Sequence, residues 1–538
     1  QSVAEWVRAE TAALGTVVSA LEARLRTPDA SVMALPQELS RIRDQAVGLE
    51  ARLGLRLGFE TVRPAAEAKD GPGQGAVVGF ADSMAKVLPR AGVPKLAVAP
   101  RMEVRLARNE KEAFQVIVVP VEEDLRQVAA RVRDLRGPGG APFPADRVDA
   151  VPVGYVQAKA VPPYGSPHVG WWPDPILDFM DAVDIAKGDA QAFWVRVRAP
   201  KGQAAGRYSG TLEVLVGGKP AFTFGLTVRV YGFTLPDASP LPLAITFAPH
   251  DHPTAETKAQ QAEWRKADDY PVNAWRAHVA EWADFLADYY ITYDSLYGYQ
   301  NWKPDFAQLQ RLHARGQLGR FNLGYYGKCP ADEAGIAKWK TSTLDRLRPL
   351  YERAKALGIL DHAYIYGCDE HKTADFPHVE RAASLIKAAF PDVMVMTTTY
   401  DQSYGLDSAI VSMDAFCPLT PRFDPAKAAK ARARGKQVWW YICCGPHHPH
   451  ANMFVEYPAI EGRLLMGALT AKYRPDGFLY YQISIWNSQH PIQDGPFTDW
   501  DPRSWTSYHG DGSWTCVCLL YTSPSPRDLS TSRMPSSA

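Results

Sequence analysis

Two adjacent carboxylates, Asp369 and Glu370, are the residues of this sequence best suited to acid–base chemistry. They stand in the stretch YIYGCDEH, residues 364–371, where an apolar run typical of a short strand ends. Two carboxylates are the smallest set of groups that hydrolyses a glycosidic bond. One protonates the leaving oxygen, and the other manages the positive charge at the anomeric carbon. The alternative is that both acids belong to the N-cap and first turn of the following helix.

The adjacency of the two acids constrains the mechanism. Neighbouring side chains of a regular strand point to opposite faces, so both acids can reach one pocket only where the backbone bends at the strand end. Such a pair suits substrate-assisted catalysis, in which the 2-acetamido oxygen of the sugar attacks the anomeric carbon. One carboxylate then steadies the oxazolinium ion, while its neighbour acts first as an acid and then as a base.

Further polar and aromatic side chains stand near the ends of other predicted strands. Aromatic rings stack on sugar faces, although any single ring is more often part of a core. The set as a whole, rather than any one member, favours a carbohydrate site. The candidates for substrate binding are His250, Tyr326, Tyr400, Tyr441, Trp486 and Asn487.

These candidates need a scaffold that gathers the ends of several strands. From residue 239 onward, strand-like runs alternate with segments whose apolar residues follow helical spacing, which predicts a (β/α)8 barrel over residues 239–514. A doubly wound sheet is the rival fold, but no glycine-rich phosphate loop follows the first strand. We expect the barrel to lack its last helix, because an unrelated tail stands where that helix belongs. The eight predicted strands are residues 242–247, 291–297, 320–326, 363–367, 393–400, 414–420, 437–444 and 477–484.

Two further units precede the barrel. Residues 1–63 have two runs of apolar residues at helical spacing and predict a helical hairpin, and the composition of residues 64–76 is that of a linker. Residues 77–238 contain short alternating strands, such as RMEVRLA and FWVRVRAP, separated by Gly/Pro turns, which predicts a β-sandwich. The fold class expected is therefore multidomain, with all-β and α/β parts.

The last stretch of the sequence, residues 515–538, has neither helical nor strand periodicity. It reads TCVCLLYTSPSPRDLSTSRMPSSA and resembles the translated read-through of a sequencing adapter, a contaminant of metagenomic assemblies. We expect it to be non-native and disordered. A natural disordered tail is the alternative.

The composition excludes several partners. The 538 residues carry a formal net charge of zero, which gives no reason to expect nucleic acid or an anionic membrane surface. No apolar run reaches membrane-spanning length. The seven cysteines show no zinc-like spacing, so neither a disulfide framework nor a metal site is predicted, and no cofactor is expected. The sequence PHHPH at residues 446–450 is interpreted as a rim loop rather than a metal site.

Four stretches together resemble glycoside hydrolase family 123, whose members include β-N-acetylgalactosaminidases and relatives described as a domain of unknown function. YIYGCDE is similar to the Asp-Glu catalytic motif of that family. LARNEKEAFQVIVVP and QAFWVRVRAPKGQAAGRYSGTLEV are similar to its β-sandwich, and residues 438–487 resemble its seventh and eighth barrel strands. The resemblance covers about residues 77–514.

The resemblance implies a role for each residue that matches the family pattern. Glu370 would be the general acid and base, and Asp369 would orient and stabilise the acetamido group. A tyrosine at the barrel mouth, Tyr441 or Tyr400, would hydrogen-bond the acetamido oxygen. The sugar pocket would be walled by Trp486 and Asn487.

The expected activity is that of a retaining exo-glycosidase that releases β-linked N-acetylgalactosamine, or a related N-acetylhexosamine, from a glycan through an oxazoline intermediate. One alternative is a glycosidase of the same fold that acts on a sugar without the 2-acetamido group. Another is a non-catalytic carbohydrate-binding protein. The sequence departs from the family at His371, where members often carry proline, which leaves the fine specificity open. A secreted or periplasmic location is expected from the substrate class, and the oligomeric state is not predicted.

Overall fold

The computed structural model describes most of residues 75–251 and 278–517. It also describes residue 266, the strand 529–531 and scattered positions between 8 and 23. The scattered positions between 8 and 23 are all helical. The gaps within the main ranges are 92–93, 95, 299–301, 328, 487–494, 499 and 505. The rest of the predicted hairpin, and the predicted linker up to residue 74, lie outside the described residues. None of the described helices is long and apolar enough to cross a bilayer.

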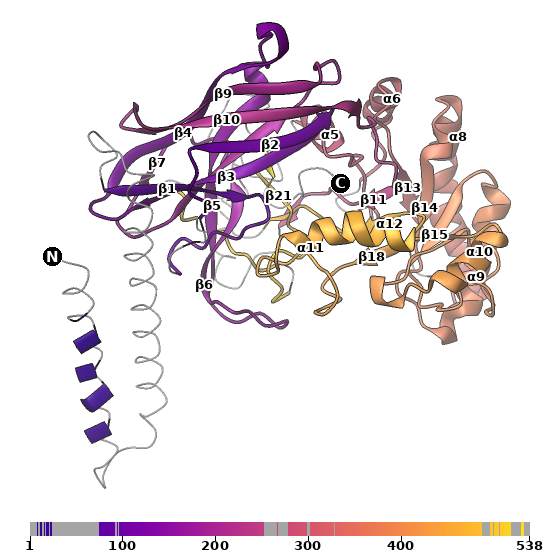
Figure 1. Ribbon diagram of the computed structural model, residues 1–538. Helices are drawn as coiled ribbons and strands as arrows, with labels where there is room; N and C mark the ends of the chain where they lie inside the picture. The colour runs from indigo at the N-terminus through magenta and orange to yellow at the C-terminus, as the bar shows by residue number, and fades with distance from the viewer. Residues whose placement is uncertain are drawn as a thin grey trace.

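Residues 76–234 form a β-sandwich of two five-stranded sheets (Figure 1). One sheet has the order β1 (Ala76–Asp82), β3 (Lys111–Pro120), β8 (Gln191–Arg198), β5 (Val148–Ala158) and β6 (Gly170–Ile176). The other has the order β2 (Arg101–Arg108), β10 (Lys219–Thr234), β9 (Gly206–Val216), β4 (Leu125–Arg136) and β7 (Val183–Ile185). All neighbouring strands are antiparallel except β2 and β10. Two short 3₁₀ helices, η2 (Pro138–Gly140) and η3 (Ala145–Arg147), lie between β4 and β5.

Strand alternation produces the sandwich core. Along β8, Phe193, Val195 and Val197 are fully buried between the sheets, whereas Trp194 and Arg196 on the other face are half-buried. The predicted β-sandwich is therefore present in the structure, with its first strand beginning one residue before the expected boundary.

Parallel strands and helices alternate in the second part of the chain (Figure 1). The strands are β11 (Leu243–Ile245), β12 (His250–Asp251), β13 (Phe321–Tyr325), β14 (Ala363–Tyr366), β15 (Met394–Thr397), β16 (Ala415–Phe416), β17 (Gln437–Val438), β18 (Trp440–Ile442), β19 (Phe478–Tyr480) and β20 (Ile485–Trp486). The helices are α5 (Val279–Ala287), α6 (Phe306–Ala314), α7 (Glu333–Trp339), η5 (Lys340–Asp345), α8 (Arg346–Ala356), η6 (Leu360–His362), η7 (Thr373–Asp375), α9 (Phe376–Ala389), η8 (Thr420–Arg422), α10 (Pro425–Ala433), α11 (Ile460–Arg463), η9 (Leu464–Leu469) and α12 (Thr470–Tyr473).

The helices form because their apolar residues recur on one face. In α9, Phe376, Val379, Ala383 and Ile386 follow the spacing of three and four residues and are buried against the strands. In α10, Asp424 is the N-cap, and its carboxylate accepts hydrogen bonds from the first-turn amides. Seven of the eight predicted strand segments contain a strand, and the exception is residues 291–297.

The parallel strands belong to separate sheets, so a closed (β/α)8 barrel is not confirmed. The sheets have the orders β13-β14-β15-β16-β17, β11-β19-β18 and β12-β20. Only Trp439 separates β17 from β18. Between β11 and β13 the chain at 291–297 makes isolated contacts instead of a ladder. There the Phe247 amide donates to the Asp294 carbonyl at 2.8 Å.

The end of the chain differs from the prediction. Residues 515–538 were expected to be disordered, but β21 (Thr515–Val517) and β22 (Leu529–Thr531) pair antiparallel. Both the amide and the hydroxyl of Thr515 donate to the Ile483 carbonyl, at 3.0 and 2.9 Å, so the ordered domain extends to this residue. The rest of the predicted tail lies outside the described part of the chain.

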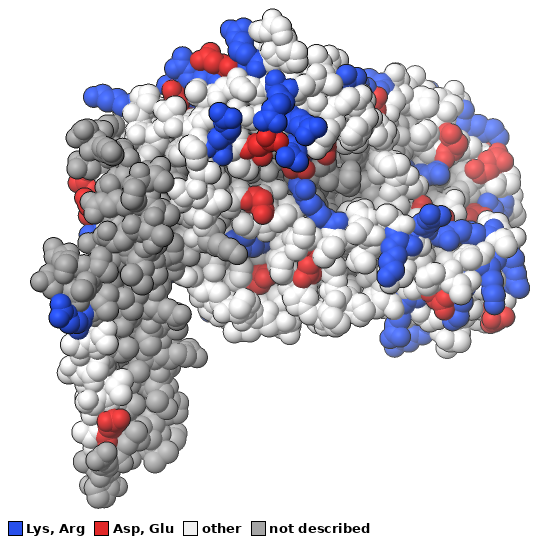
Figure 2. Space-filling model, in the orientation of Figure 1, with Lys and Arg blue, Asp and Glu red and all other residues white. Residues whose placement is uncertain are grey.

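Charges of both signs are interspersed over the visible face of the molecule (Figure 2). This distribution agrees with the formal net charge of zero and gives that face no strongly cationic surface.

Candidate active site

The two acids follow β14 at a sharp irregularity of the backbone. Cys368 and Glu370 have φ angles of 48° and 54°, in the left-handed region that non-glycine residues rarely adopt. Before them, Gly367 passes so close to the Tyr326 ring that a Cβ atom would lie 2.6 Å from it. Left-handed residues on both sides of Asp369 end the strand alternation. Strain of this kind persists where the surrounding structure enforces it, commonly at functional sites.

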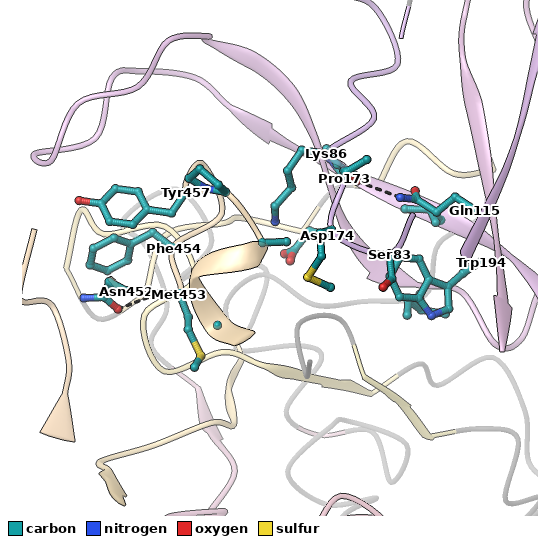
Figure 3. A pocket seen from close by; sticks show the side chains of 17 residues that line it. Ser83, Lys86, Gln115, Pro173, Asp174, Trp194, Asn452, Met453, Phe454 and Tyr457 are labelled. Carbon is teal, nitrogen blue, oxygen red and sulfur yellow. Dashed lines mark hydrogen bonds between the residues drawn. The ribbon is translucent and has the colours of Figure 1, made fainter. Parts of the chain in front are cut away.

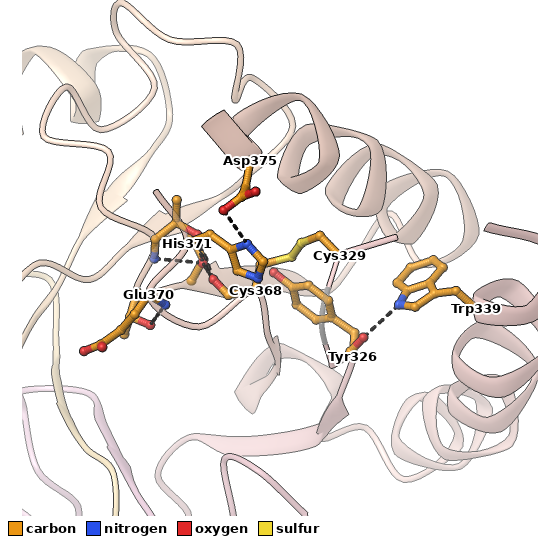
Figure 4. The surroundings of a disulfide bond; sticks show 10 residues. Tyr326, Cys329, Trp339, Cys368, Glu370, His371 and Asp375 are labelled. Atoms are coloured by element: carbon orange, nitrogen blue, oxygen red, sulfur yellow. Dashed lines mark hydrogen bonds and ion pairs between the residues drawn. A yellow bond between two sulfur atoms is a disulfide. The ribbon is translucent and has the colours of Figure 1, made fainter. Parts of the chain in front are cut away.

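Cys368 is anchored on three sides. Its sulfur forms a disulfide with Cys329, which lies in the loop after β13 (Figure 4). Its amide donates to the Gly327 carbonyl at 3.0 Å, and its own carbonyl accepts from the hydroxyls of Thr397 and Thr399 at 2.9 and 2.7 Å. These bonds hold the backbone directly before the acid pair. No disulfide framework was predicted from the cysteine spacing, and this bond corrects that expectation. It forms because the loops after two neighbouring parallel strands bring together residues 39 positions apart.

Asp369 is surrounded by hydroxyl donors. Its Oδ1 accepts from the Tyr366 Oη and from the Thr398 Oγ1, both at 2.5 Å, and its Oδ2 accepts from the Tyr297 Oη at 3.3 Å. An ionised carboxylate is an acceptor only, so three converging donors suit a negative charge at this position. Asp369 is therefore built to stay in one orientation.

Glu370 has a different environment. Its side chain is exposed and points away from the disulfide (Figure 4). Its Oε1 accepts from the Tyr441 Oη at 2.7 Å, and its amide donates to the Thr398 Oγ1 at 3.2 Å. Burial raises the pKa of the Tyr441 hydroxyl well above its usual range, and the hydrogen bond with Glu370 adds to this effect. An exposed carboxylate with one firm partner is placed to exchange a proton with a bound molecule.

Two of the predicted substrate-binding residues gather at the pair. Tyr441 bonds Glu370 directly. Tyr400 is 39% exposed, and burial followed by its hydrogen bond with Glu370 raises the pKa of its hydroxyl. Tyr326, in contrast, is 1% exposed and packs in the core between the strands and the helices. Its side chain therefore lies away from the acids.

The remaining predicted residues cannot be placed at the site. Asn487 and the side chains of His250 and Trp486 lie outside the described residues. The backbones of β12 and β20 pair in parallel, with Asp251 opposite Trp486.

A group of three tyrosines around Asp369 was not predicted from the sequence. The rings of Tyr297, Tyr325 and Tyr366 lie 5.5–6.1 Å apart, and the hydroxyls of Tyr297 and Tyr366 donate to the Asp369 carboxylate. Burial raises the pKa of Tyr325 to about 12, with a contribution from the Asp369 charge. The available signal was that each of these tyrosines ends, or nearly ends, a predicted strand.

One cluster of potential metal ligands occurs among the described residues. The sulfurs of Cys329 and Cys368 and a ring nitrogen of His371 lie within 4.8 Å of one another. Metals bind thiolates, whereas these sulfurs are joined in a disulfide. The His371 Nδ1 lies 3.3 Å from the Asp375 Oδ2, so the ring also has a carboxylate partner (Figure 4). The arrangement as it stands is a structural clamp beside the acids.

A cavity of about 100 Å³ lies between the sandwich and residues 452–462 (Figure 3). Lys86, Gln115 and Asp174 supply its polar groups, and Phe454 and Tyr457 lie on its other side. A second cavity of about 340 Å³ is lined by β11, β19 and the 466–471 helix, and is mainly apolar. Neither cavity is lined by Asp369 or Glu370, so neither supplies the acid–base chemistry.

Comparison with known proteins identifies the family of both domains. The catalytic-domain model of glycoside hydrolase family 123 matches residues 246–516, and the N-terminal-domain model of the same family matches residues 98–216. No curated protein sequence matches the chain.

Among solved structures, a family 123 glycoside hydrolase from Clostridium perfringens, described in connection with glycolipid glycan hydrolysis, has a TM-score of 0.63 at 13% identity. The alignment covers 86% of this chain and 85% of that chain, which shows a shared fold. An FMN-binding β-glucuronidase from Faecalibacterium prausnitzii has a TM-score of only 0.28 at 9% identity, with 78% of this chain and 55% of that chain covered. The catalytic-domain match includes the acid pair and spans half of the sequence, and the chain belongs to glycoside hydrolase family 123.

Proposed function

We propose that this glycoside hydrolase is a retaining exo-enzyme that releases β-linked N-acetylgalactosamine, or a related N-acetylhexosamine, through an oxazoline intermediate. The observation that carries the proposal is the contrast between two adjacent carboxylates. Asp369 is fixed by three hydroxyl donors, whereas Glu370 is exposed and is contacted by Tyr441 and Tyr400. A fixed anion and an accessible acid are the two groups that substrate-assisted hydrolysis requires.

In the first step, the acetamido carbonyl oxygen attacks the anomeric carbon, and the bond to the leaving-group oxygen breaks. The carboxylic acid of Glu370 donates its proton to that oxygen. The Asp369 carboxylate accepts a hydrogen bond from the acetamido N–H and balances the positive charge of the oxazolinium ion.

In the second step, the Glu370 carboxylate removes a proton from water, and the water oxygen attacks the anomeric carbon. The bond between that carbon and the acetamido oxygen breaks, which restores the acetamide and leaves Glu370 protonated for the next cycle. Two inversions at one carbon give net retention of configuration.

Tyr400 is our candidate for the hydrogen bond to the acetamido oxygen. At 39% exposed it is the most accessible of the tyrosines around the pair, so its hydroxyl can reach a bound sugar.

The scaffold is proposed to be a (β/α)8-type barrel with an irregular second strand. Support comes from one inner cluster, in which side chains from six different strands and from residue 296 pack together. Its members include Ala244, Leu296, Tyr364, Met396, Trp439 and Leu479. Secretion or export to a periplasm is proposed from the substrate class alone. The glycan of a glycolipid is one candidate substrate, because the Clostridium perfringens relative is described in connection with glycolipid glycan hydrolysis.

The proposal is tested by assaying three 4-nitrophenyl glycosides: the β-N-acetylgalactosaminide, the β-N-acetylglucosaminide and the plain β-galactoside. We expect turnover of an acetamido sugar and competitive inhibition by N-acetylgalactosamine-thiazoline, which mimics the oxazoline. Turnover of the plain galactoside without thiazoline inhibition would instead support a glycosidase that does not use acetamido participation. Absence of turnover from a folded protein, together with binding of a glycan, would favour a binding protein.

A further inference from the structure

Aromatic rings from both domains form one cluster, which includes His447 in the loop after the strand of Tyr441. Its members, which we call the rim cluster, are Tyr164, His447, Phe454 and Tyr508. Tyr164 belongs to residues 159–169, the connection between β5 and β6 of the sandwich, whereas the other three belong to the catalytic domain. The Tyr164 ring stacks on Phe454 at 4.2 Å with an interplanar angle of 6°. It also lies 5.8 Å from Tyr508 and 6.1 Å from His447.

The position of Tyr164 is fixed by a buried polar pair. Its hydroxyl donates to the Glu456 Oε2 at 2.5 Å, and the Glu456 Oε1 lies 2.5 Å from the His509 Nδ1. The side chains of Glu456 and His509 are 1% and 5% exposed. A buried carboxylate needs partners of this kind, and here one of the partners is the tyrosine of the other domain. The sandwich therefore contributes an oriented ring to the catalytic half.

The rim cluster connects to the acid pair on the Glu370 side. His447 lies six residues beyond Tyr441, which bonds Glu370, and the His447 Nε2 lies 2.9 Å from the Cys444 carbonyl. The hydrogen bond with Cys443 lowers the pKa of the Cys444 thiol, and the Glu370 carboxylate is among the charges that act on it. Burial raises the pKa of Tyr508, with a contribution from Cys444. The loop that follows Tyr441 therefore carries His447 of the rim cluster, and its Cys444 thiol is close enough to both Glu370 and Tyr508 for their charges to interact.

Which part of the substrate this surface contacts depends on whether it lies nearer to Glu370 or to Asp369. A general acid must face the leaving-group oxygen, while the residue that steadies the acetamido group faces the sugar being released. The tyrosines around Asp369 stand on the other side, at Tyr297, Tyr325 and Tyr366. The exposed imidazole of His447 and the half-buried ring of Tyr508 have centroids 5.7 Å apart with an interplanar angle of 26°, and both belong to the part of the chain that follows the Glu370 partner Tyr441.

We propose that Tyr164, His447 and Tyr508 bind the leaving-group portion of the glycan, by stacking on the apolar face of the hexose that follows the scissile bond. The inference rests on the proposed function for the assignment of Glu370 as the acid. It gives the sandwich domain a direct part in substrate selection, because one of the three rings comes from that domain. The ligand class is a hexopyranose, since aromatic faces recognise the C–H surfaces of sugars.

The test compares two ligands on matched variants. The first is a disaccharide of β-linked N-acetylgalactosamine on galactose, and the second is the thiazoline, which occupies only the released-sugar position. For His447→Ala and Tyr508→Ala we expect kcat/KM on the disaccharide to fall about tenfold, mainly through KM, with the Kd of the thiazoline unchanged within about twofold. Tyr164→Phe, which keeps the ring but loses the bond to Glu456, should give a smaller loss than Tyr164→Ala. Tyr231→Ala, on β10 of the sandwich, is the control for loss of a tyrosine elsewhere.

An unchanged KM for the disaccharide in both His447→Ala and Tyr508→Ala would overturn the inference. So would an equal loss of disaccharide and thiazoline binding, which would indicate general damage to the site. His447 is exposed, so its variant is expected to fold, and melting temperatures check all variants. If the wild-type enzyme instead cleaves a plain galactoside and ignores the thiazoline, the proposed function fails. The same variants are then compared on a galactosyl disaccharide, against galactose as the ligand of the released-sugar position.

Discussion

Thr398 hydrogen-bonds both acids. Replacing it should show how much activity depends on the position of the acids, independently of the stability of the fold. Its Oγ1 donates to the Asp369 Oδ1 at 2.5 Å and accepts from the Glu370 amide at 3.2 Å. Thr398→Val keeps the shape of the side chain and removes both bonds. A hydrogen bond to a charged group contributes about 1.5–3 kcal/mol, which corresponds to about a ten- to hundredfold loss of kcat/KM if the loss falls on the transition state.

The neighbouring residue provides a matched control. Thr399 is also buried, but its hydroxyl donates to the Cys368 carbonyl at 2.7 Å and lies 2.8 Å from the Thr397 hydroxyl, so its described hydrogen bonds are to neither acid. Thr399→Val should lower the melting temperature by a similar amount with a smaller loss of activity than Thr398→Val, because the Thr397 hydroxyl and the disulfide still hold Cys368. Thr398→Ser, which keeps the hydroxyl, should restore most of the kcat that Thr398→Val loses.

The assay is steady-state hydrolysis of the 4-nitrophenyl acetamido sugar, together with thermal unfolding of each variant. A fall in kcat with little change in KM is expected for Thr398→Val, because the misplaced acids affect the reaction more than ground-state binding. The reasoning is refuted if Thr398→Val retains wild-type kcat/KM. It is also refuted if Thr399→Val loses as much activity as Thr398→Val, since the effect would then be general.

Three further changes have definite expected results. Tyr441→Phe removes the hydroxyl that donates to Glu370, so kcat should fall about tenfold and the alkaline limb of the pH–rate profile, which reports loss of the general acid, should move, as measured by initial rates across pH. Cys329→Ser, or reduction of the wild type with a phosphine, frees Cys368 from its clamp and should lower both the melting temperature and kcat; activity unaffected by full reduction, verified by thiol titration, would contradict this. Burial raises the pKa of Asp294 to about 7, above its unfolded value of about 4, so the stability from its protonated form is present below about pH 4 and lost as pH rises toward 7. Asp294→Asn should flatten that part of the curve of unfolding free energy against pH, and an unchanged slope would count against the buried-acid assignment.

The periodicity of the sequence was sufficient to place the acid pair. An apolar run followed by two acids predicted a strand end, and parallel strands bring their carboxyl ends to one edge, which is how Tyr400 and Tyr441 come to lie beside Glu370. The sandwich was also predictable, because its strands alternate buried and half-buried residues over long stretches.

Other features depended on information that periodicity does not contain. Tyr326 was predicted to bind substrate, but its neighbour Tyr325 is the residue near Asp369. Side chains alternate along a strand, so Tyr326 points into the core while Tyr325 faces Asp369. Residues 291–297 have the composition of a strand. However, the Asp294 carboxylate accepts a hydrogen bond from the Asn322 amide at 2.8 Å, and in a regular strand pair a backbone carbonyl would accept that bond.

Long-range partners were equally invisible. The pairing of Cys329 with Cys368 spans 39 residues and follows only from the adjacency of β13 and β14. Thr398 lies in a run of three threonines that is ordinary for a strand. Its role is set by where Asp369 and Glu370 turn after the strand, and that turn depends on left-handed residues that no composition rule predicts.

The measurement that tests the central claim most directly is azide rescue of the acid pair. Glu370→Gln and Asp369→Asn are each assayed on 4-nitrophenyl β-N-acetylgalactosaminide with and without azide, and the product is identified by nuclear magnetic resonance. If Glu370 is the acid and base and the acetamido group is the nucleophile, azide should rescue Glu370→Gln and give the β-configured glycosyl azide, while Asp369→Asn stays inactive. Formation of the α-configured azide by Asp369→Asn would identify Asp369 as the nucleophile and contradict the account, as would wild-type activity in either variant.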